Sequence, residues 1–143
     1  MGPIVCATRG GAASRRTQER AIQLAQENDA LLIFLFVADT SGAGQLESPL
    51  AEAVADELVQ LGHRLLSIAR ERAAGQGVTA QTAVRVGRVR EVAEEFLREV
   101  GAGQLVVGAS NAASEPQILL PGEINSFAQG VQAATGVPVL VVE

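Results

Sequence analysis

The sequence predicts an α/β protein with a parallel sheet, on the basis of two patterns. Five short runs of β-branched and other apolar residues alternate along the chain with longer stretches whose apolar residues recur at helical spacing. Strands that are separated by helices pair in parallel through right-handed crossovers. We therefore expect one domain over residues 1–143, a three-layer α/β/α sandwich around a five-stranded parallel sheet.

The first half of the chain predicts two strands and two helices. Residues 3–8 form a short apolar run before two glycines, and residues 12–28 show helical spacing. Residues 31–37 are apolar without interruption, which is typical of a strand covered on both faces, and we expect this strand at the centre of the sheet. A long helix is expected over residues 50–74. Its apolar stripe consists of Val54, Leu58, Leu61, Leu65 and Ile68.

The second half predicts three strands and two helices. Residues 78–86 alternate between apolar and polar side chains, which is typical of an edge strand with one wetter face. A helix over residues 88–100 ends at glycines, and a short strand over 104–107 ends at Gly108. A final helix follows Gly122, and a β-branched strand completes the chain over residues 137–142.

The composition excludes several classes of function. The 11 basic residues are all arginines, the formal net charge is -5, and Trp and Tyr are absent, so we expect neither nucleic-acid nor membrane binding. The single cysteine, Cys6, excludes an intrachain disulfide, and no His/Cys cluster has the spacing of a zinc site. Without a visible signal peptide or an apolar run long enough to span a bilayer, we expect a soluble cytoplasmic protein.

Glycines mark two of the expected strand ends. Thr8-Arg9-Gly10-Gly11 follows the first strand, and a loop from Gly108 to Gly122 follows the fourth. In open α/β sheets a ligand crevice forms beyond the carboxyl ends of the strands, where the strand order reverses. If the first strand is central, these two loops line that crevice. A glycine-marked loop that runs into a helix start is also suited to holding a phosphate.

Four short motifs in order resemble the universal stress protein family over nearly the whole chain. They are Ala7-Thr-Arg-Gly10, Val86-Gly-Arg88, Leu105-Val-Val-Gly108 and Val137-Pro-Val-Leu-Val-Val142. The resemblance implies an adenine nucleotide alpha hydrolase-like fold with the strand order 3-2-1-4-5. It also implies a homodimer that pairs the last strand, Val137 to Val142, across a two-fold axis.

The loop after the fourth strand departs from the pattern of the family's ATP binders. That pattern is Gly-x-x-Gly, nine residues, then Gly-Ser or Gly-Thr, whereas this chain has Asn111 for the second glycine and Glu123 after a late Gly122. A carboxylate at about 4 Å from a phosphate would cost roughly 4 kcal/mol per charge pair at an effective dielectric of about 20. Pro121 removes one further backbone donor.

Arg9 stands where the family usually has Asp in the nucleotide pocket. Three roles remain open for Arg9: an ion pair with Glu123 or another local acid, a solvated surface side chain, or a ligand for a phosphate or another anion. In the first role, Arg9 and Glu123 together would fill the pocket.

The remaining reactive residues have plainer interpretations. We expect His63 to be a surface or boundary histidine and Cys6 a small buried apolar residue, and Ser110 either donates to a ligand or stabilises a turn. No nucleophile, base and orienting group can be assembled, so we expect no enzymatic activity. The candidate pocket consists of Thr8, Arg9, Gly10, Val37, Gly108, Ser110, Asn111, Gly122 and Glu123.

Two functions follow from this interpretation. The first is a dimeric, non-catalytic regulatory protein of the universal stress type that requires no cofactor and has lost the usual ATP contacts. The alternative is a protein that binds ATP, AMP or another small phosphate ligand, with or without slow ATP hydrolysis.

Overall fold

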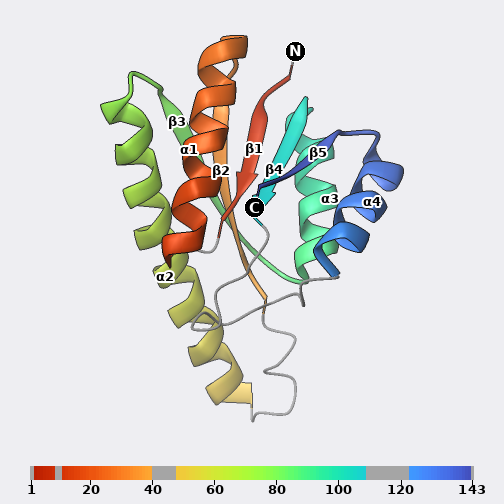
Figure 1. Cartoon of the computed structure of the whole chain (residues 1–143). Coiled ribbons are helices and arrows are strands. Elements are labelled where there is room, and N and C mark those ends of the chain that lie inside the picture. The colour runs from red at the N-terminus through yellow and green to blue at the C-terminus, as the bar shows by residue number, and fades with distance from the viewer. Residues whose placement is uncertain (1, 9–10, 40–47, 109–122, 143) are drawn as a thin grey trace.

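The computed structural model describes residues 2–8, 11–39, 48–108 and 123–142, which form a five-stranded sheet with helices on both faces (Figure 1). In chain order the elements are β1 (Ile4–Ala7), α1 (Gly11–Asn28), β2 (Leu32–Ala38), α2 (Ser48–Gly75), β3 (Ala80–Val86), α3 (Val89–Val100), β4 (Gln104–Gly108), α4 (Glu123–Thr135) and β5 (Val139–Val142). The predicted fold class is confirmed.

The strand order is β3-β2-β1-β4-β5, and every neighbouring pair is parallel, as the family resemblance implied. Ile4 on β1 lies opposite Leu32 on β2 and Gln104 on β4. The central strand is therefore β1, and the expectation that residues 31–37 form the centre was wrong. β2 lies beside the centre and is covered just as fully, which is why its sequence is apolar throughout.

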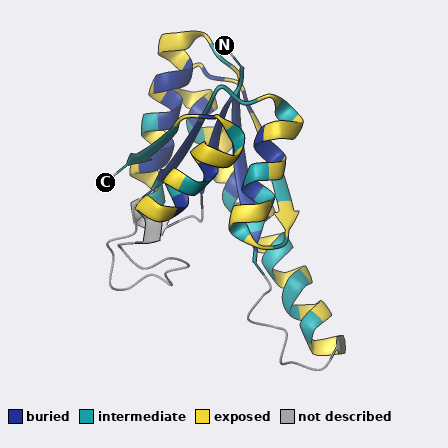
Figure 2. Cartoon of the chain, turned by 90° about the vertical axis from the view of Figure 1, so that its right-hand side faces the viewer, coloured by how far each residue is buried: buried dark blue, intermediate teal, exposed yellow. Residues whose placement is uncertain are grey.

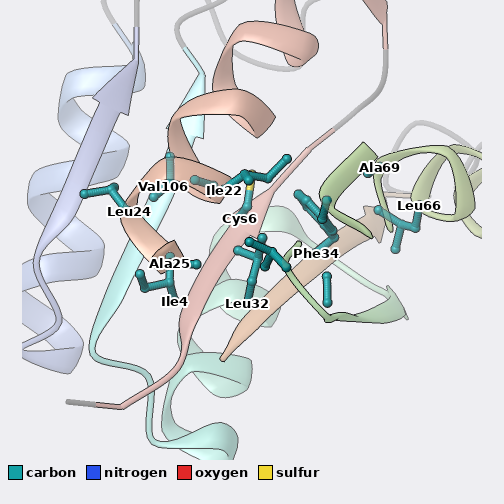
Figure 3. Packing of buried hydrophobic residues seen from close by; sticks show 14 of the residues in the cluster. Ile4, Cys6, Ile22, Leu24, Ala25, Leu32, Phe34, Leu66, Ala69 and Val106 are labelled. Carbon is teal, nitrogen blue, oxygen red and sulfur yellow. The ribbon is translucent and has the colours of Figure 1, made fainter. Parts of the chain in front are cut away.

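The core has two layers, one on each face of the sheet. α1 and α2 cover one face, and α3 and α4 cover the other (Figure 1). Successive residues of β1 alternate between the layers, since Ile4 and Cys6 join the first cluster and Val5 joins the second. Figure 3 shows Ile22 of α1 and Leu66 of α2 in the first layer, together with Cys6 and Phe34 from the strands.

The two edge strands are less buried than the interior strands. β3 runs from a buried Ala80 to an exposed Val86, which confirms the edge position predicted from its alternating sequence. β5 pairs only with β4 and is half-buried along its whole length. Each edge therefore keeps one row of backbone hydrogen-bonding groups that has no partner strand within the described residues.

α2 does not bury the apolar stripe that its sequence displays. The residues that are buried against the sheet are Gly62, Leu66, Ala69 and Ala73, whereas Leu61 and Ile68 are exposed. A Cβ atom on Gly62 would lie 2.5 Å from Cδ1 of Phe36, so the helix rests directly on that ring. The small residues of α2 allow this close approach. Leu58 and Leu65 of the stripe are half-buried against the same core cluster, whereas Leu61 and Ile68 are left exposed.

Candidate functional site

The candidate site lies where β1 and β4 run side by side and end. The chain leaves β1 for α1 on one face of the sheet, whereas it leaves β4 for α4 on the opposite face (Figure 1). The strand order therefore reverses between β1 and β4, which is where open α/β sheets form a ligand crevice. The structure confirms that the first strand is central, and the position of the crevice stays a prediction from this strand order.

Thr8 follows β1 and is held by hydrogen bonds from two directions. Its backbone N–H donates to the carbonyl oxygen of Leu35 on β2 at 3.0 Å, and its hydroxyl accepts from Nε2 of Gln18 at 3.0 Å. Thr8 and Gln18 are both buried. The end of the central strand is thus fixed to its neighbouring strand and to α1.

Gln18 extends this contact to α2. Its side-chain oxygen accepts a hydrogen bond of 2.6 Å from Nη1 of Arg72, so both ends of the buried amide have partners. A hydrogen bond from a charged donor is stronger than one between neutral groups. The path from Thr8 through Gln18 to Arg72 therefore ties β1, α1 and α2 together beside the crevice.

Gly108 is the last residue of β4, and its small size is explained by a packing contact. A Cβ atom built at this position would run into the hydroxyl oxygen of Thr17, which is buried on α1. The residue must stay small for α1 to pack here, whether or not a ligand approaches the loop that follows.

The predicted site residues fall into three groups. Thr8, Val37 and Gly108 are described, and α1 contacts both Thr8 and Gly108 through consecutive residues. Val37 is half-buried near the end of β2 and packs against the other core layer. The remaining predicted residues, Arg9, Gly10, Ser110, Asn111 and Gly122, lie outside the described residues.

For Glu123 the structure describes only the backbone. It is the first residue of α4, as the sequence predicted when it placed a helix start after Gly122. The proposed ion pair between Arg9 and Glu123 stays a prediction.

The sequence interpretation missed Thr17 and Gln18. Both are polar, yet they precede Ala21 and Ile22 by four residues each and share the buried side of α1 with them. Polar residues on the apolar side of an amphipathic helix need hydrogen-bond partners when they are buried. Their position on the buried side of α1 was the sequence signal that could have marked Thr17 and Gln18 as residues that hold the strand ends in place.

Cys6 is completely buried on β1 (Figure 3). Burial disfavours the thiolate and raises the pKa of the Cys6 thiol to about 12. The thiol therefore stays protonated at neutral pH, as expected for a small buried apolar residue. His63 is exposed on α2, as predicted.

Within the described part of the chain, no group of three His, Cys, Asp or Glu side chains is placed to hold a metal ion. The described helices include none that is long and apolar enough to cross a membrane.

Comparison with known families identifies this arrangement. The model of the universal stress protein family matches residues 1–143. The chain belongs to this family. No curated protein sequence matches this universal stress protein.

Solved structures of other universal stress proteins share the fold. The universal stress protein UspA from Lactobacillus plantarum is 18% identical with a TM-score of 0.79, and the match covers 99% of this chain and 97% of that one. A universal stress protein in complex with cAMP is 23% identical with a TM-score of 0.71, covering 99% and 97%. An AMP-bound family member from Arabidopsis thaliana is 17% identical with a TM-score of 0.66, covering 98% and 90%.

Proposed function

We propose that this universal stress protein is a non-catalytic regulatory protein of the stress response whose crevice no longer binds ATP in the manner of the family's ATP binders. The observation that carries the proposal is the packing at the two strand ends. Gly108 accommodates the hydroxyl of Thr17, and the Thr8 hydroxyl accepts a hydrogen bond from Gln18. Both contacts serve the fold itself, so neither residue by itself indicates a nucleotide.

The sequence of the loop after β4 also supports this proposal. The second glycine of the ATP-binding pattern is replaced by Asn111, and Glu123 takes the place of the phosphate-binding Ser or Thr. α4 begins at Glu123, so an acidic residue occupies the first position of the helix, where a phosphate would otherwise contact free backbone amides. Negative charge at this position opposes the binding of a triphosphate more strongly than that of a monophosphate.

Two other residues, Cys6 and His63, support a role without catalysis. The thiol of Cys6 is buried with a raised pKa, and His63 is exposed on a helix whose first half extends past the sheet (Figure 2). Neither group is a suitable nucleophile or base for a ligand between β1 and β4.

A second function is supported by two of the solved relatives. Their structures contain cAMP and AMP, each of which carries one phosphate group. A monophosphate needs fewer compensating contacts than ATP, and Arg9, which follows Thr8 in the sequence, offers a cation. AMP binding is therefore the alternative function of this crevice.

A homodimer through β5 is part of the proposal. β5 is half-buried and has an open edge in the single chain, so a second copy of the strand would complete its backbone hydrogen bonding. A symmetric pair of β5 strands would make an isologous contact. Truncation before Val137 should abolish this dimer in sedimentation experiments.

Titration of the purified protein with ATP and AMP, with and without Mg²⁺, tests the choice of ligand. Calorimetry and thermal shift should detect no saturable ATP binding below about 100 μM, since a bound ligand would stabilise the native state. Saturable ATP binding in that range would contradict the main proposal, whereas binding of AMP alone would favour the second function.

The double substitution Arg9→Asp with Glu123→Ser tests the physical reason. It restores the family's residue types at both positions, so ATP affinity should rise. The matched control is Arg88→Asp with Glu91→Ser, which makes the same charge change at the start of α3. Equal ATP affinity in the two double variants would refute the role assigned to Arg9 and Glu123.

A further inference from the structure

The first half of α2 carries apolar side chains that the described chain covers only in part, since Leu58 and Val59 touch the first core cluster but Leu50 and Leu61 are exposed. Across residues 49–61 no side chain is buried, and the first buried residue of the helix is Gly62. Figure 2 shows this half extending away from the buried strands, and Figure 1 shows α2 reaching well past the end of the sheet. An isolated stretch of helix is only marginally stable in water, so this half gains little support from its own domain.

Five exposed or half-buried apolar residues of α2 follow the spacing of a coiled coil. Val54, Leu58, Leu61, Leu65 and Ile68 are separated by four, three, four and three residues, which is a period of 3.5. Leu61 is 41% exposed and Ile68 is 51% exposed, and the other three are half-buried. We call these five residues the α2 seam.

The seam borders the side of α2 that is buried on the sheet, and its half-buried members Leu58 and Leu65 also pack against the first core cluster. That side consists of Gly62, Leu66, Ala69 and Ala73, all of which are buried. Of the five large apolar side chains that are exposed among the described residues, three are on α2: Leu50, Leu61 and Ile68. Exposed apolar residues in a continuous row indicate a surface that binds another protein.

We propose that the α2 seam binds the α2 seam of a second copy of this chain in an antiparallel arrangement. Leu58 then packs beside Leu61 of the partner subunit, and Val54 packs beside Leu65 of the partner subunit. Ala51, one heptad before Leu58, packs beside Ile68 of the partner subunit. These layers all fall within α2, which begins at Ser48 and ends at Gly75.

The charges beside the seam select this register. Glu57 and Arg64 directly precede Leu58 and Leu65, and both are exposed without a hydrogen-bond or ion-pair partner among the described residues. In the proposed register Glu57 lies next to Arg64 of the partner subunit, and the two-fold symmetry repeats the pair. Such flanking charges determine orientation and partner choice in coiled coils.

Other arrangements lose this complementarity. A shift of one heptad in one direction places Glu57 beside Glu57 of the partner subunit, and a shift in the other direction places Glu57 beside Glu71 of the partner subunit. In a parallel pair the position opposite Glu57 is occupied by Gly62 of the partner subunit, which cannot form an ion pair. The formal net charge of -5 on each copy also opposes contacts that lack opposite charges.

The mass of the assembly in solution, compared between the wild type and Leu61→Glu, tests whether the seam is an interface. At about 50 μM, sedimentation should give a larger mass for the wild type than for the variant, because the substitution buries two carboxylates beside apolar residues. The matched control is Leu31→Glu, since Leu31 is also 41% exposed but lies before β2. This control should keep the wild-type mass.

The β5 contact does not remove this difference. If β5 also pairs, Leu61→Glu remains a β5 dimer, whereas the wild type joins such dimers through their seams into a larger assembly. Equal masses for the wild type and Leu61→Glu would overturn the proposal. That outcome includes the case in which the seam is covered by Ile118, Leu119 and Leu120 of the same chain, which lie outside the described residues.

Charge reversal tests the register. Glu57→Arg alone and Arg64→Glu alone should each raise the dissociation constant of the seam contact about tenfold, because each places like charges together twice. The double variant should return the constant to near its wild-type value, since the opposite pairs are restored with their signs exchanged. A double variant that associates no better than the single variants would exclude this antiparallel register.

Discussion

α2 and α3 both display regular apolar spacing in the sequence, but they use it differently. In α3 the apolar positions Ala93, Phe96 and Leu97 are buried against the sheet. In α2 the apolar row includes the exposed Leu61 and Ile68, while Gly62, Leu66, Ala69 and Ala73 are buried against the sheet. The comparison teaches that apolar periodicity identifies a helix and an apolar side, but does not identify what that side binds.

The largest expected effect concerns Phe96 on α3. Phe96 is 3% exposed, and its ring lies 5.2 Å from the guanidinium carbon of Arg85. Phe96→Ala should lower the free energy of unfolding by about 3 to 5 kcal/mol, because it leaves a cavity in the second core layer. Denaturant titration at a protein concentration too low for association would measure the loss.

Leu61→Ala on α2 is the contrasting substitution for that measurement. Its side chain is already 41% exposed, so the same dilute titration should show a loss of less than about 0.5 kcal/mol. A similar loss for Phe96→Ala and Leu61→Ala would mean that α2 and α3 use their apolar residues in the same way.

The next largest effect concerns two helical glycines. Gly62→Ala on α2 should cost about 1 to 2 kcal/mol, since the new methyl group meets the ring of Phe36 at 2.5 Å. Gly130→Ala on α4 should instead stabilise the protein by about 0.5 to 1 kcal/mol, because its nearest neighbour is the mobile end of Arg90 and alanine favours a helix. Thermal unfolding of both variants measures the difference, and equal signs would refute the close packing of α2 on Phe36.

A smaller effect is expected from the thiol of Cys6 at high pH. Its pKa is raised from 9.0 to about 12 by burial, so the unfolded chain loses this proton at a lower pH than the folded chain. Stability from the neutral thiol is fully present below pH 9.0 and declines between 9.0 and about 12. At about pH 10 the loss should be on the order of 1 kcal/mol relative to neutral pH.

Comparison with Cys6→Ala isolates that contribution. The variant lacks the thiol, so its free energy of unfolding should decline less steeply above pH 9.0. Parallel pH profiles for the wild type and Cys6→Ala would show that the thiol ionises equally in both states.

The order and type of the elements could be predicted from the sequence because the helices had a clear apolar period and the strands were short apolar or alternating runs, most of them bordered by glycine. The position of β2 in the sheet could not be predicted in this way. β1 and β2 are both covered on two faces, so both have the sequence of a continuous apolar run. The family resemblance supplied the strand order, and the structure placed β1 at the centre.

The sequence could predict which strand ends lie together, but not the contacts that support them. Two strand ends marked by glycine proved to be those of the neighbouring strands β1 and β4. The contact between Thr17 and Gly108 joins residues far apart in the chain, so no local pattern could reveal it. The same is true of the path from Thr8 through Gln18 to Arg72, which depends on how α1 and α2 pack.

The different uses of α2 and α3 can be measured most directly by amide hydrogen exchange at low and high protein concentration. Residues 49–61 should exchange quickly in dilute protein and become protected as the concentration rises, whereas α3 should keep the same protection at both concentrations. If residues 49–61 are equally protected at both concentrations, a second copy of the chain does not cover the α2 seam.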